Sequence, residues 1–311
     1  MVQDSFARKI FRYITDAGYR FTVNQSRFGI YNDMSDEEYL KRFFKYKMGY
    51  ELDLERPQTF NEKIQWLKIY NRNPAYTTMV DKFEAKKYVA GIIGEKYIIP
   101  TLGVWNHFDE INFEVLPSRF VLKCTHDYNS VVICRDKEKL DLRQVKQKLT
   151  NCLARNFYYY GREWVYKNVK PRIIAEQYME DDNSNELTDY KFLCFDGHVK
   201  CSFVCTERFK RDGLKVTLFD RDWKRLPFEL HYPASKKDIP KPVNYDKMIE
   251  LAETLSKNIP FVRVDFYETN QRVYFGELTF YPFNGMIDFI PFEWDYELGS
   301  WINLPKVKML S

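Results

Sequence analysis

Long apolar runs are absent from this 311-residue sequence, and no stretch approaches the roughly 20 apolar residues that a membrane-spanning helix needs. The first residues, Met1-Val-Gln-Asp-Ser5, also lack the basic and then apolar pattern of a secretory signal. We therefore expect a cytoplasmic protein with no membrane span.

An excess of charge of one sign is also missing. Lys and Arg number 48 against 44 Asp and Glu, and the resulting net charge of +4 is too small to attract nucleic acid by charge alone. No nucleic acid is therefore expected as a partner, although a local basic groove stays possible.

Paired cysteines are missing too: the six cysteines include no Cys-x-x-Cys pair, so the sequence spells out neither a zinc ribbon nor a redox motif. Cys194, His198, Cys201 and Cys205 do cluster, but Asp196-Gly197 predicts a tight turn between two strands. Side chains on such strands would not converge on one tetrahedral point, which favours small buried side chains over a metal site.

The composition that is present is that of a globular protein, with 45% hydrophobic and 30% charged residues. The length fits one large domain or two interlocked domains. The aromatic residues, 6 Trp, 23 Tyr and 25 Phe, could form rigid pockets whose faces stack on sugar or base rings, although most aromatic side chains fill cores.

The pattern of apolar residues predicts an α+β protein with a helical N-terminal region. Ser35 and Thr59 each stand three residues before a Glu, the capping-box arrangement, and each opens a periodic apolar segment. Residues 80–89 predict a third amphipathic helix with a solvated charged face. Further elements are predicted as strands at 119–124, 130–134 and 172–178, a helix at 142–157, strands at 190–195 and 199–205, a helix at 245–257, and strands at 261–267 and 273–280.

The last two predicted strands carry the most informative residues. Side chains alternate along a strand, so Arg263 and Asp265 share one face, and Glu277 and Thr279 share another. If the hairpin closes around residue 271, Asp265 lies opposite Glu277 with Cβ atoms roughly 4.5–5.5 Å apart. Such carboxylates repel unless a cation or a proton lies between them. The set predicts either a Mg²⁺ and phosphate platform or a cross-strand cluster neutralised by Arg263, with about equal weight.

A resemblance favours the first interpretation. The order of Asp81-Lys82 on a helix, Val121-Leu-Lys123 and Ala175-Glu-Gln-Tyr-Met179 on strands, Asp189, Arg263-x-Asp265 and Glu277 resembles the ATP-grasp superfamily. Further motifs resemble its TupA-like branch, which is linked to teichuronopeptide and surface-polysaccharide synthesis: Pro57-Gln-Thr-Phe-Asn-Glu-Lys63, Phe120-Val-Leu-Lys-Cys-Thr-His126, Asp189-Tyr-Lys-Phe192, Asp222-Trp-Lys-Arg-Leu-Pro-Phe228 and Phe275-Gly-Glu-Leu-Thr-Phe280. The resemblance runs from about residue 36 to Pro305.

The resemblance implies an ATP-grasp fold in which two α+β subdomains clasp ATP. It divides the chain into a helical region (1–78), an ATP-grasp domain (79–305) and a tail (306–311). Within the domain, residues 118–175 would form the lid, and residues 176–305 the C-terminal subdomain that holds metal and ATP.

The implied activity is an ADP-forming carboxylate–amine ligase that forms an amide through an acyl phosphate. The partners implied are a carboxylate-bearing sugar or polysaccharide precursor and a small amine or amino acid, in the cytoplasm of a bacterium that builds a capsule or other surface polysaccharide. A glutamyl carboxylate is an equally open acceptor.

The resemblance also gives each matched residue a role. Arg263 and Lys123 would be catalytic, and Asp265, Glu277 and Thr279 would hold Mg²⁺. The residues expected to bind ATP are Lys82 and Lys123 at the phosphates, Glu176, Gln177, Tyr178 and Met179 at the adenine, Asp189 at the ribose, and Lys191 in the same motif.

Two positions depart from the family pattern. The loop at residues 125–130, which would normally be glycine-rich, contains no glycine, and Thr279 stands where many superfamily members carry Asn. The loop leaves open a slow enzyme, or a binding module that holds nucleotide or polysaccharide.

Other enzyme classes stay open as alternatives. Asp220-Arg-Asp222 is the Asp-x-Asp of metal-dependent glycosyltransferases, although a polar turn is the more common meaning of so short a motif. Paired carboxylates about 5 Å apart would also suit a retaining glycoside hydrolase, but Lys82, Lys123 and Arg263 would then have no task. The aromatic stretch at residues 157–164 could hold sugar, but packing is its commoner role.

Overall fold

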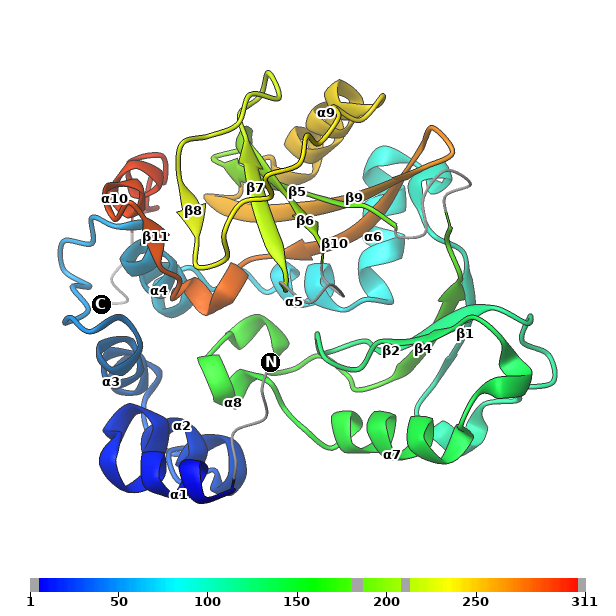
Figure 1. Cartoon of the computed structure of the whole chain (residues 1–311), viewed down its shortest axis with the longest axis horizontal. Coiled ribbons are helices and arrows are strands. Elements are labelled where there is room, and N and C mark those ends of the chain that lie inside the picture. Colours follow the sequence, from blue (N-terminus) through cyan, green and yellow to red (C-terminus); the bar gives the residue numbers. More distant parts are fainter. Residues whose placement is uncertain (1–5, 181–186, 208–212, 307–311) are drawn as a thin grey trace.

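The computed structural model describes residues 6–180, 187–207 and 213–306. Figure 1 shows N-terminal helices beside the two main sheets, the smaller below and the larger above in that view. Among the residues that it describes, no helix has the length and apolar character needed to cross a bilayer.

The N-terminal region is helical, as predicted. It contains α1 (Phe6–Thr15), α2 (Ala17–Phe28), α3 (Asp36–Met48) and α4 (Phe60–Tyr70). Both predicted helix starts are confirmed: the Ser35 hydroxyl accepts the Glu38 N–H at 3.2 Å before α3, and Thr59 and Glu62 form a reciprocal capping box before α4.

The helix predicted at residues 80–89 is wrong in its first turn, and with it the placement of Asp81 and Lys82 on a helix. α5 (Ala75–Val80) ends at Val80, and α6 (Glu84–Ile93) begins only after a break. Asp81 is extended there, and its Oδ1 accepts the N–H groups of Phe83 and Glu84, which caps α6. The break leaves the Lys82 N–H free to donate to the Thr125 carbonyl at 3.0 Å.

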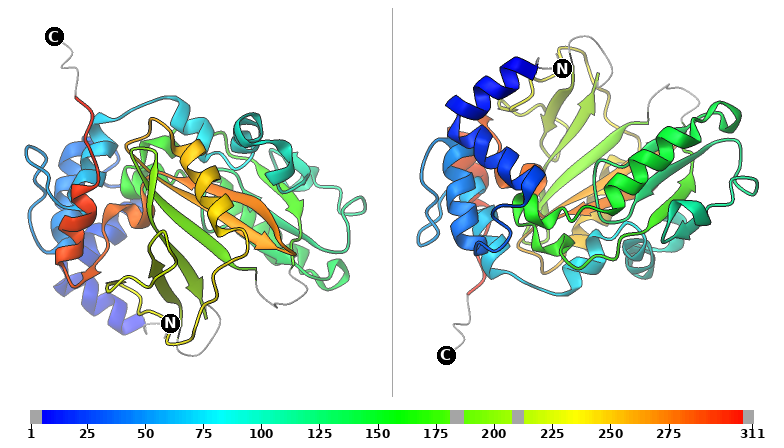
Figure 2. Two further views of the ribbon diagram at one scale, coloured as in Figure 1. Left: turned by 90° about the horizontal axis from the view of Figure 1, so that it is seen from above. Right: turned by 90° about the horizontal axis from the view of Figure 1, so that it is seen from below.

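The smaller sheet is antiparallel, with strand order β1-β4-β2-β3. Its strands are β1 (Thr101–Trp105), β2 (Phe120–Cys124), β3 (Val132–Cys134) and β4 (Ile173–Gln177), of which β1 was not predicted. α7 (Leu142–Leu153) lies across one face (Figure 2), and Leu122, Leu149 and Ala175 are fully buried between helix and sheet.

The helix predicted at residues 142–157 is too long, because α7 ends at Leu153. His126 Nε2 lies 3.2 Å from the Cys152 carbonyl and 3.1 Å from that of Arg155, so the ring satisfies carbonyls at the helix end. The chain then turns into the short α8 (Tyr158–Gly161).

The larger sheet has the order β10-β9-β5-β6-β7, and α9 (Tyr245–Ser256) packs over it (Figure 2). Its strands are β5 (Asp189–Phe195), β6 (His198–Thr206), β7 (Lys215–Phe219), β9 (Phe261–Thr269) and β10 (Arg272–Thr279). The predicted turn at Asp196-Gly197 is confirmed, with φ of 48° and 83°. All six cysteines are free, and within the described ranges no His, Cys, Asp and Glu side chains gather as a metal site.

The C-terminal helix α10 (Glu293–Ser300) packs against the N-terminal helix α4. Before it, β11 (Phe289–Ile290) pairs with β8 (Glu229–Leu230) in a separate two-stranded sheet. Asn61 of α4 donates to Asp295 and to the Ile287 carbonyl, and a Cβ on Gly299 would lie 2.1 Å from the Gln58 carbonyl oxygen. The predicted boundary at residue 78 therefore falls after a helix that packs on the C-terminal part, and it stays a prediction.

Candidate ATP and acceptor site

The predicted pairing of Asp265 with Glu277 is confirmed, although it depends on a bulge that was not predicted. Asn270 and Gln271 form a tight turn at positive φ, and the strands pair Arg272 with Thr269. That register alone would place Gly276 opposite Asp265. A bulge at Gly276 shifts the pairing by one residue, so Glu277 comes opposite Asp265.

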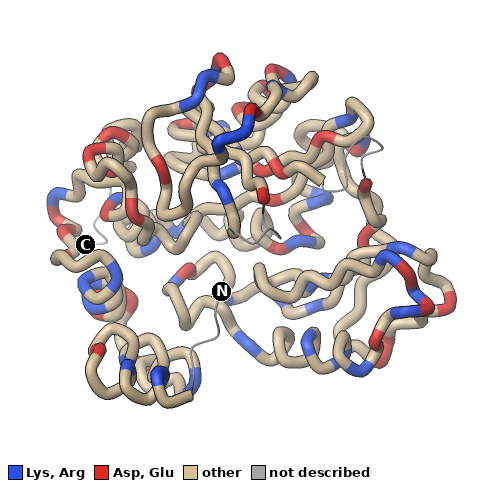
Figure 3. Tube along the Cα trace, viewed as in Figure 1, with Lys and Arg blue, Asp and Glu red and all other residues tan. Residues whose placement is uncertain are grey.

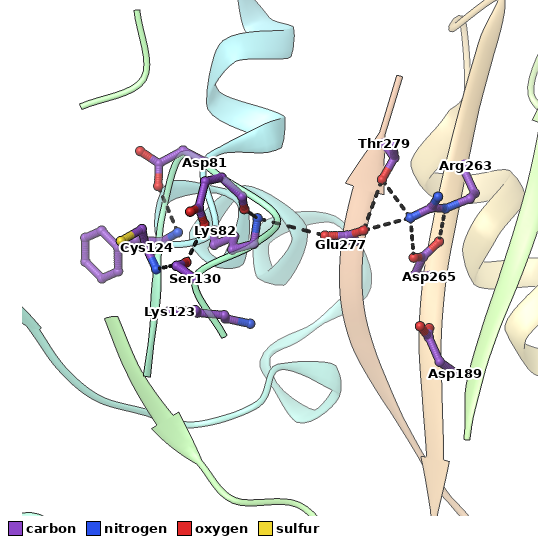
Figure 4. Close-up of polar contacts among 12 residues, drawn as sticks. Asp81, Lys82, Lys123, Cys124, Ser130, Asp189, Arg263, Asp265, Glu277 and Thr279 are labelled. Carbon is purple, nitrogen blue, oxygen red and sulfur yellow. Dashed lines mark hydrogen bonds and ion pairs between the residues drawn. The ribbon is translucent and has the colours of Figure 1, made fainter. Parts of the chain in front are cut away.

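Arg263 lies between the two carboxylates (Figure 4). Its guanidinium donates to both Asp265 oxygens at 2.7 Å, to Glu277 Oε1 at 2.7 Å and to the Thr279 hydroxyl at 3.0 Å. The cation that the repelling carboxylates require is thus the arginine itself in this structure. This is the neutralised cross-strand cluster that the sequence allowed as an alternative to a metal platform.

Lys191 extends this cluster on the next strand. Its ammonium lies 2.5 Å from Asp265 Oδ2 and 2.5 Å from Asp189 Oδ2. Burial would lower the pKa of Lys191, but Asp189 and Asp265 outweigh it and raise the pKa above its usual value. Asp189 Oδ1 is buried with no hydrogen-bond partner among the described residues, which leaves an acceptor for a ligand hydroxyl.

Glu277 is the carboxylate of this cluster that is most open to a ligand. Its Oε2 accepts no hydrogen bond from a described residue, and Lys82 lies 4.0 Å away. Burial opposes its ionisation, yet Lys82 and Arg263 lower the pKa of Glu277 to about 2. Glu277 therefore carries a full negative charge at neutral pH.

Lys82 connects this cluster to the glycine-poor loop at residues 125–130. Its ammonium donates to the Asp127 carbonyl. The loop is closed by side chains: Ser130 Oγ accepts the Cys124 N–H at 2.6 Å and donates to Asp127 Oδ1. These bonds give the loop a defined shape without glycine.

The backbone N–H groups of this loop are available to bind an anion. The N–H groups of residues 126–130 donate to no atom of the described residues. Consecutive free N–H groups beside a lysine are typical of phosphate-binding loops. Tyr128 turns its exposed ring toward Phe157, with ring centroids 5.1 Å apart.

Glu176 on β4 is held by two lysines. Its oxygens lie 2.5 Å from Lys123 Nζ and 2.6 Å from Lys86 Nζ. Burial opposes ionisation of Glu176, but Lys123 and Lys86 lower its pKa below the usual value. Lys86 was missed by the sequence analysis, although it lies in the charged segment that was interpreted as a solvated face.

The rest of the predicted adenine strand is more open. Gln177 is exposed and its N–H donates to the Pro100 carbonyl at 3.0 Å, whereas Tyr178 and Met179 are half-buried just beyond β4. The predicted residues therefore form two groups, one around Glu176 and Lys123 and one around Arg263.

A cavity of about 640 Å³ opens beside the Arg263 cluster. Arg263, Glu277 and Thr279 line one wall, and none of the predicted ATP-binding residues lines it. Its other walls are strongly aromatic, with Phe43, Tyr128, Tyr160, Tyr166, Tyr232, Tyr281 and Phe283. These side chains come from five separate segments, so no sequence motif identified them as one site.

Glu163 is a further residue of this cavity that the sequence analysis missed. It lines the same cavity, and its side chain has no hydrogen-bond partner among the described residues. The charged groups that face it are Lys68 from α4 and Arg263 from β9, together with the phenols of Tyr128, Tyr166 and Tyr281. Burial raises the pKa of Glu163 to about 7, against the attraction of Lys68.

The neighbours of Glu163 fix its position. The buried Arg162 donates to the Tyr31 and Met34 carbonyls, and Lys68 donates to the Gly161 carbonyl at 3.0 Å. A Cβ on Gly161 would also lie 2.3 Å from Asn284 Oδ1, so the backbone passes close to that amide. The carboxylate is thus presented to the cavity from a rigid segment.

The Asp-x-Asp motif lies in a surface turn. Asp220 accepts the N–H groups of Asp222 and Lys224, and the Asp222 side chain is 76% exposed. It is the polar turn that the sequence favoured over a sugar-nucleotide site.

A profile of the TupA-like ATPgrasp family matches residues 62–303. The chain belongs to the TupA-like ATP-grasp family. Membership confirms the resemblance carried by the motifs and the ATP-grasp α+β fold predicted from it. No curated protein matches the chain.

Solved structures similar to this TupA-like chain are ATP-grasp ligases of low identity. They include D-alanine–D-alanine ligases from Bacillus anthracis, complexed with ATP (16% identity, TM-score 0.36, covering 65% of this chain and 53% of that one), and from Helicobacter pylori (14%, 0.41, 78% and 69%). A third is the ATP-grasp ligase PsnB complexed with a phosphomimetic variant of its minimal precursor, Mg and ADP (11%, 0.38, 70% and 57%). The chain thus spans about half the length of the first of them, and the likeness concerns the fold alone.

Proposed function

We propose that this protein is an ATP- and Mg²⁺-dependent carboxylate–amine ligase that forms an amide through an acyl phosphate and releases ADP. The observation that carries the proposal is the Arg263 cluster, because it forms one wall of a cavity large enough for a substrate while Lys82 connects it to a loop of free N–H groups. Family membership supports the same reaction class.

Each group of residues has a separate role in the proposed reaction. Lys82 and the N–H groups of residues 126–130 bind the transferred phosphate, where fixed cations and dipoles offset its charge. Arg263 stabilises the charge that develops as the acceptor carboxylate attacks phosphorus. Lys123 and Lys86, held by Glu176, bind the remaining phosphates, and Asp189 and Lys191 hold the ribose end.

The donor set suits Mg²⁺. Glu277, Asp265 and Thr279 supply only oxygen donors, and Glu277 Oε2 is unengaged by hydrogen bonds from described residues. When bound, the metal neutralises charge on the phosphates. Since Arg263 and Lys191 now neutralise Asp265, Glu277 is the residue that can accept the metal with least rearrangement.

The cavity favours a sugar as the acceptor. Aromatic rings that line a cavity offer flat apolar faces to the C–H face of a sugar ring. Lys47, which lines the same cavity, provides a cation for a carboxylate of the acceptor. We therefore propose a uronic acid unit of a surface polysaccharide precursor as the carboxylate substrate, with a glutamyl chain as the alternative.

The overall reaction can be tested with hydroxylamine as the amine. Because an acyl phosphate reacts with any small nucleophile that reaches it, ATP, Mg²⁺ and glucuronate or a glutamyl peptide should yield a hydroxamate together with ADP and phosphate. Chromatography of the nucleotide product and the ferric colour test of the hydroxamate measure this. AMP would contradict phosphoryl transfer. Turnover of UDP-glucose with release of UDP would favour the glycosyltransferase, and ATP binding without turnover would favour the binding module.

Glu163 is the expected base for the amine. An alkylammonium loses one proton to Glu163 before it attacks the acyl carbon, and the second leaves with the phosphate. Glu163→Gln should lower amide formation from glycine about 100-fold at pH 8, whereas hydroxamate formation should stay within about threefold, because hydroxylamine is already neutral. In the parent, amide formation should rise with pH as Glu163 ionises, at a pH above the usual range of a glutamate because burial raises its pKa.

The matched control is Glu250→Gln, which changes an exposed carboxylate on α9 that pairs with Lys247. It should leave both reactions unchanged. Equal losses of amide and hydroxamate in Glu163→Gln would show instead that Glu163 serves the carboxylate substrate or ATP.

A further inference from the structure

Helix α1 exposes its apolar side chains. Phe6, Ile10 and Ile14 follow one another at four-residue spacing on one face, with Phe11 beside them. Their exposed fractions are 80%, 46%, 68% and 67%, and no residue of α1 is buried. A surface helix of a globular protein normally turns such a stripe toward the core.

The contacts of α1 with the rest of the chain are polar. The Tyr13 hydroxyl donates to Asn24 Oδ1 at 2.6 Å, and Arg20 Nη1 donates to the carbonyls of Tyr13 and Ile14. The Arg12 guanidinium lies 4.4 Å from the ring centroid of Tyr19. Tyr13 and Arg12 therefore hold α1 against α2, while Phe6, Ile10, Phe11 and Ile14 stay exposed.

The same helix pair is basic. Residues 6–28 contain five Lys and Arg (Arg8, Lys9, Arg12, Arg20 and Arg27) and one acidic residue, Asp16. α1 itself contains no acidic residue, and Figure 3 shows more blue than red along these two helices. Three of these five cations thus lie on α1, the helix that carries the exposed apolar side chains.

The length, the apolar area and the charge of α1 favour a membrane surface as its binding partner. A helix of 10 residues is about 15 Å long, too short to span a bilayer. The four apolar side chains offer on the order of 500 Å², whereas a stable protein interface buries ~800 Å² per partner. An amphipathic helix with Phe and Ile on one face and Lys and Arg on the other is instead typical of helices that lie in the surface of an anionic membrane.

We propose that α1 anchors this protein peripherally to an anionic lipid bilayer. Phe6, Ile10, Phe11 and Ile14 enter the boundary between headgroups and acyl chains, and the neighbouring basic side chains contact the headgroups. The inference is independent of the proposed ligase activity.

Helix α2 packs on α1 and also lines a cavity near the Arg263 cluster. The end of α2, with Gln25 and Gly29, lines a second cavity of about 460 Å³. That cavity shares Tyr128 and Tyr160 with the cavity beside Arg263. The helix α2, which packs on α1, therefore lines a cavity that adjoins the one beside Arg263.

Flotation of the full chain with vesicles tests the proposal. The protein should float with vesicles of phosphatidylglycerol and phosphatidylcholine in equal amounts, and about tenfold less with phosphatidylcholine alone or in about 1 M salt. The triple variant Phe6→Ser, Ile10→Ser, Ile14→Ser should lose binding at least tenfold with an unchanged melting temperature.

The matched control is the variant Val115→Ser, Val243→Ser, which removes two side chains 73% and 77% exposed elsewhere on the chain. It should float like the parent. A parent that fails to float overturns the proposal, as does a triple variant that floats equally well. A triple variant that converts a dimer of the parent into a monomer, measured by light scattering without vesicles, would show that a second copy covers the stripe instead.

Discussion

Replacing Asp265 by Asn should lower the free energy of unfolding by about 3–5 kcal/mol, which is the usual cost of removing one partner from a buried ion pair. The Asp265 side chain is 1% exposed and accepts two hydrogen bonds from Arg263, and Lys191 lies 2.5 Å away. Asparagine has no charge to offset those two cations. Urea unfolding followed by circular dichroism measures the loss.

The control for this change is Asp222→Asn, at the exposed surface turn. It should alter the free energy of unfolding by no more than about 0.5 kcal/mol. If Asp265→Asn were equally mild, the cations would not depend on Asp265 for neutralisation, and the cluster would be less tightly coupled than its distances indicate.

Glu277→Gln should combine a large loss of activity with a loss of stability smaller than that of Asp265→Asn, because Glu277 pairs with Arg263 but is 37% exposed. Glu277 is the most open acid of the cluster, and its Oε2 accepts no hydrogen bond from the described residues. Loss of one preorganised electrostatic group typically costs about 10²–10³ in turnover. Release of ADP at saturating ATP measures this, and the melting temperature should fall by less than that of Asp265→Asn.

The pH dependence separates Glu277 from Glu163. The pKa of Glu277 is about 2, below its usual value, so Glu277 stays ionised at neutral pH. Its contribution to activity is lost only as the pH falls toward that value. A decline of amide formation between about pH 8 and 6 must therefore come from another group. Full activity in Glu277→Gln would show that the carboxylate serves only to neutralise Arg263.

The hairpin of β9 and β10 was predictable because strand alternation and a short turn restrict the possible pairings. The sequence placed Asp265 opposite Glu277, and the structure agrees. The agreement needed a bulge at Gly276, where a Cβ would lie 3.1 Å from the Asp265 carbonyl oxygen. A single glycine within a strand indicates such a bulge but does not say which pairing it produces.

Other parts of the site could not be predicted, because they depend on contacts between distant segments. The helix break at Asp81 comes from its capping of α6 and from its ion pair with Arg172, 91 residues away. Lys86 joins the site only through its ion pair with Glu176, a residue that is distant in the sequence. Glu163 had no motif around it, and only the walls of the cavity distinguish it from an ordinary surface acid.

The contact of α4 with α10 has a consequence for folding during synthesis. Asn61 and its partner Asp295 are 234 residues apart, and a ribosome that adds 5–20 residues per second needs on the order of 10–50 s to make that interval. Until then Phe60 and Ile64, both buried in the finished protein, lack the C-terminal segments around Phe289 and Gly285 that lie against them. Nascent chains should therefore be vulnerable to aggregation and dependent on chaperones for most of their translation, and the burial of α4 should be among the last events of folding.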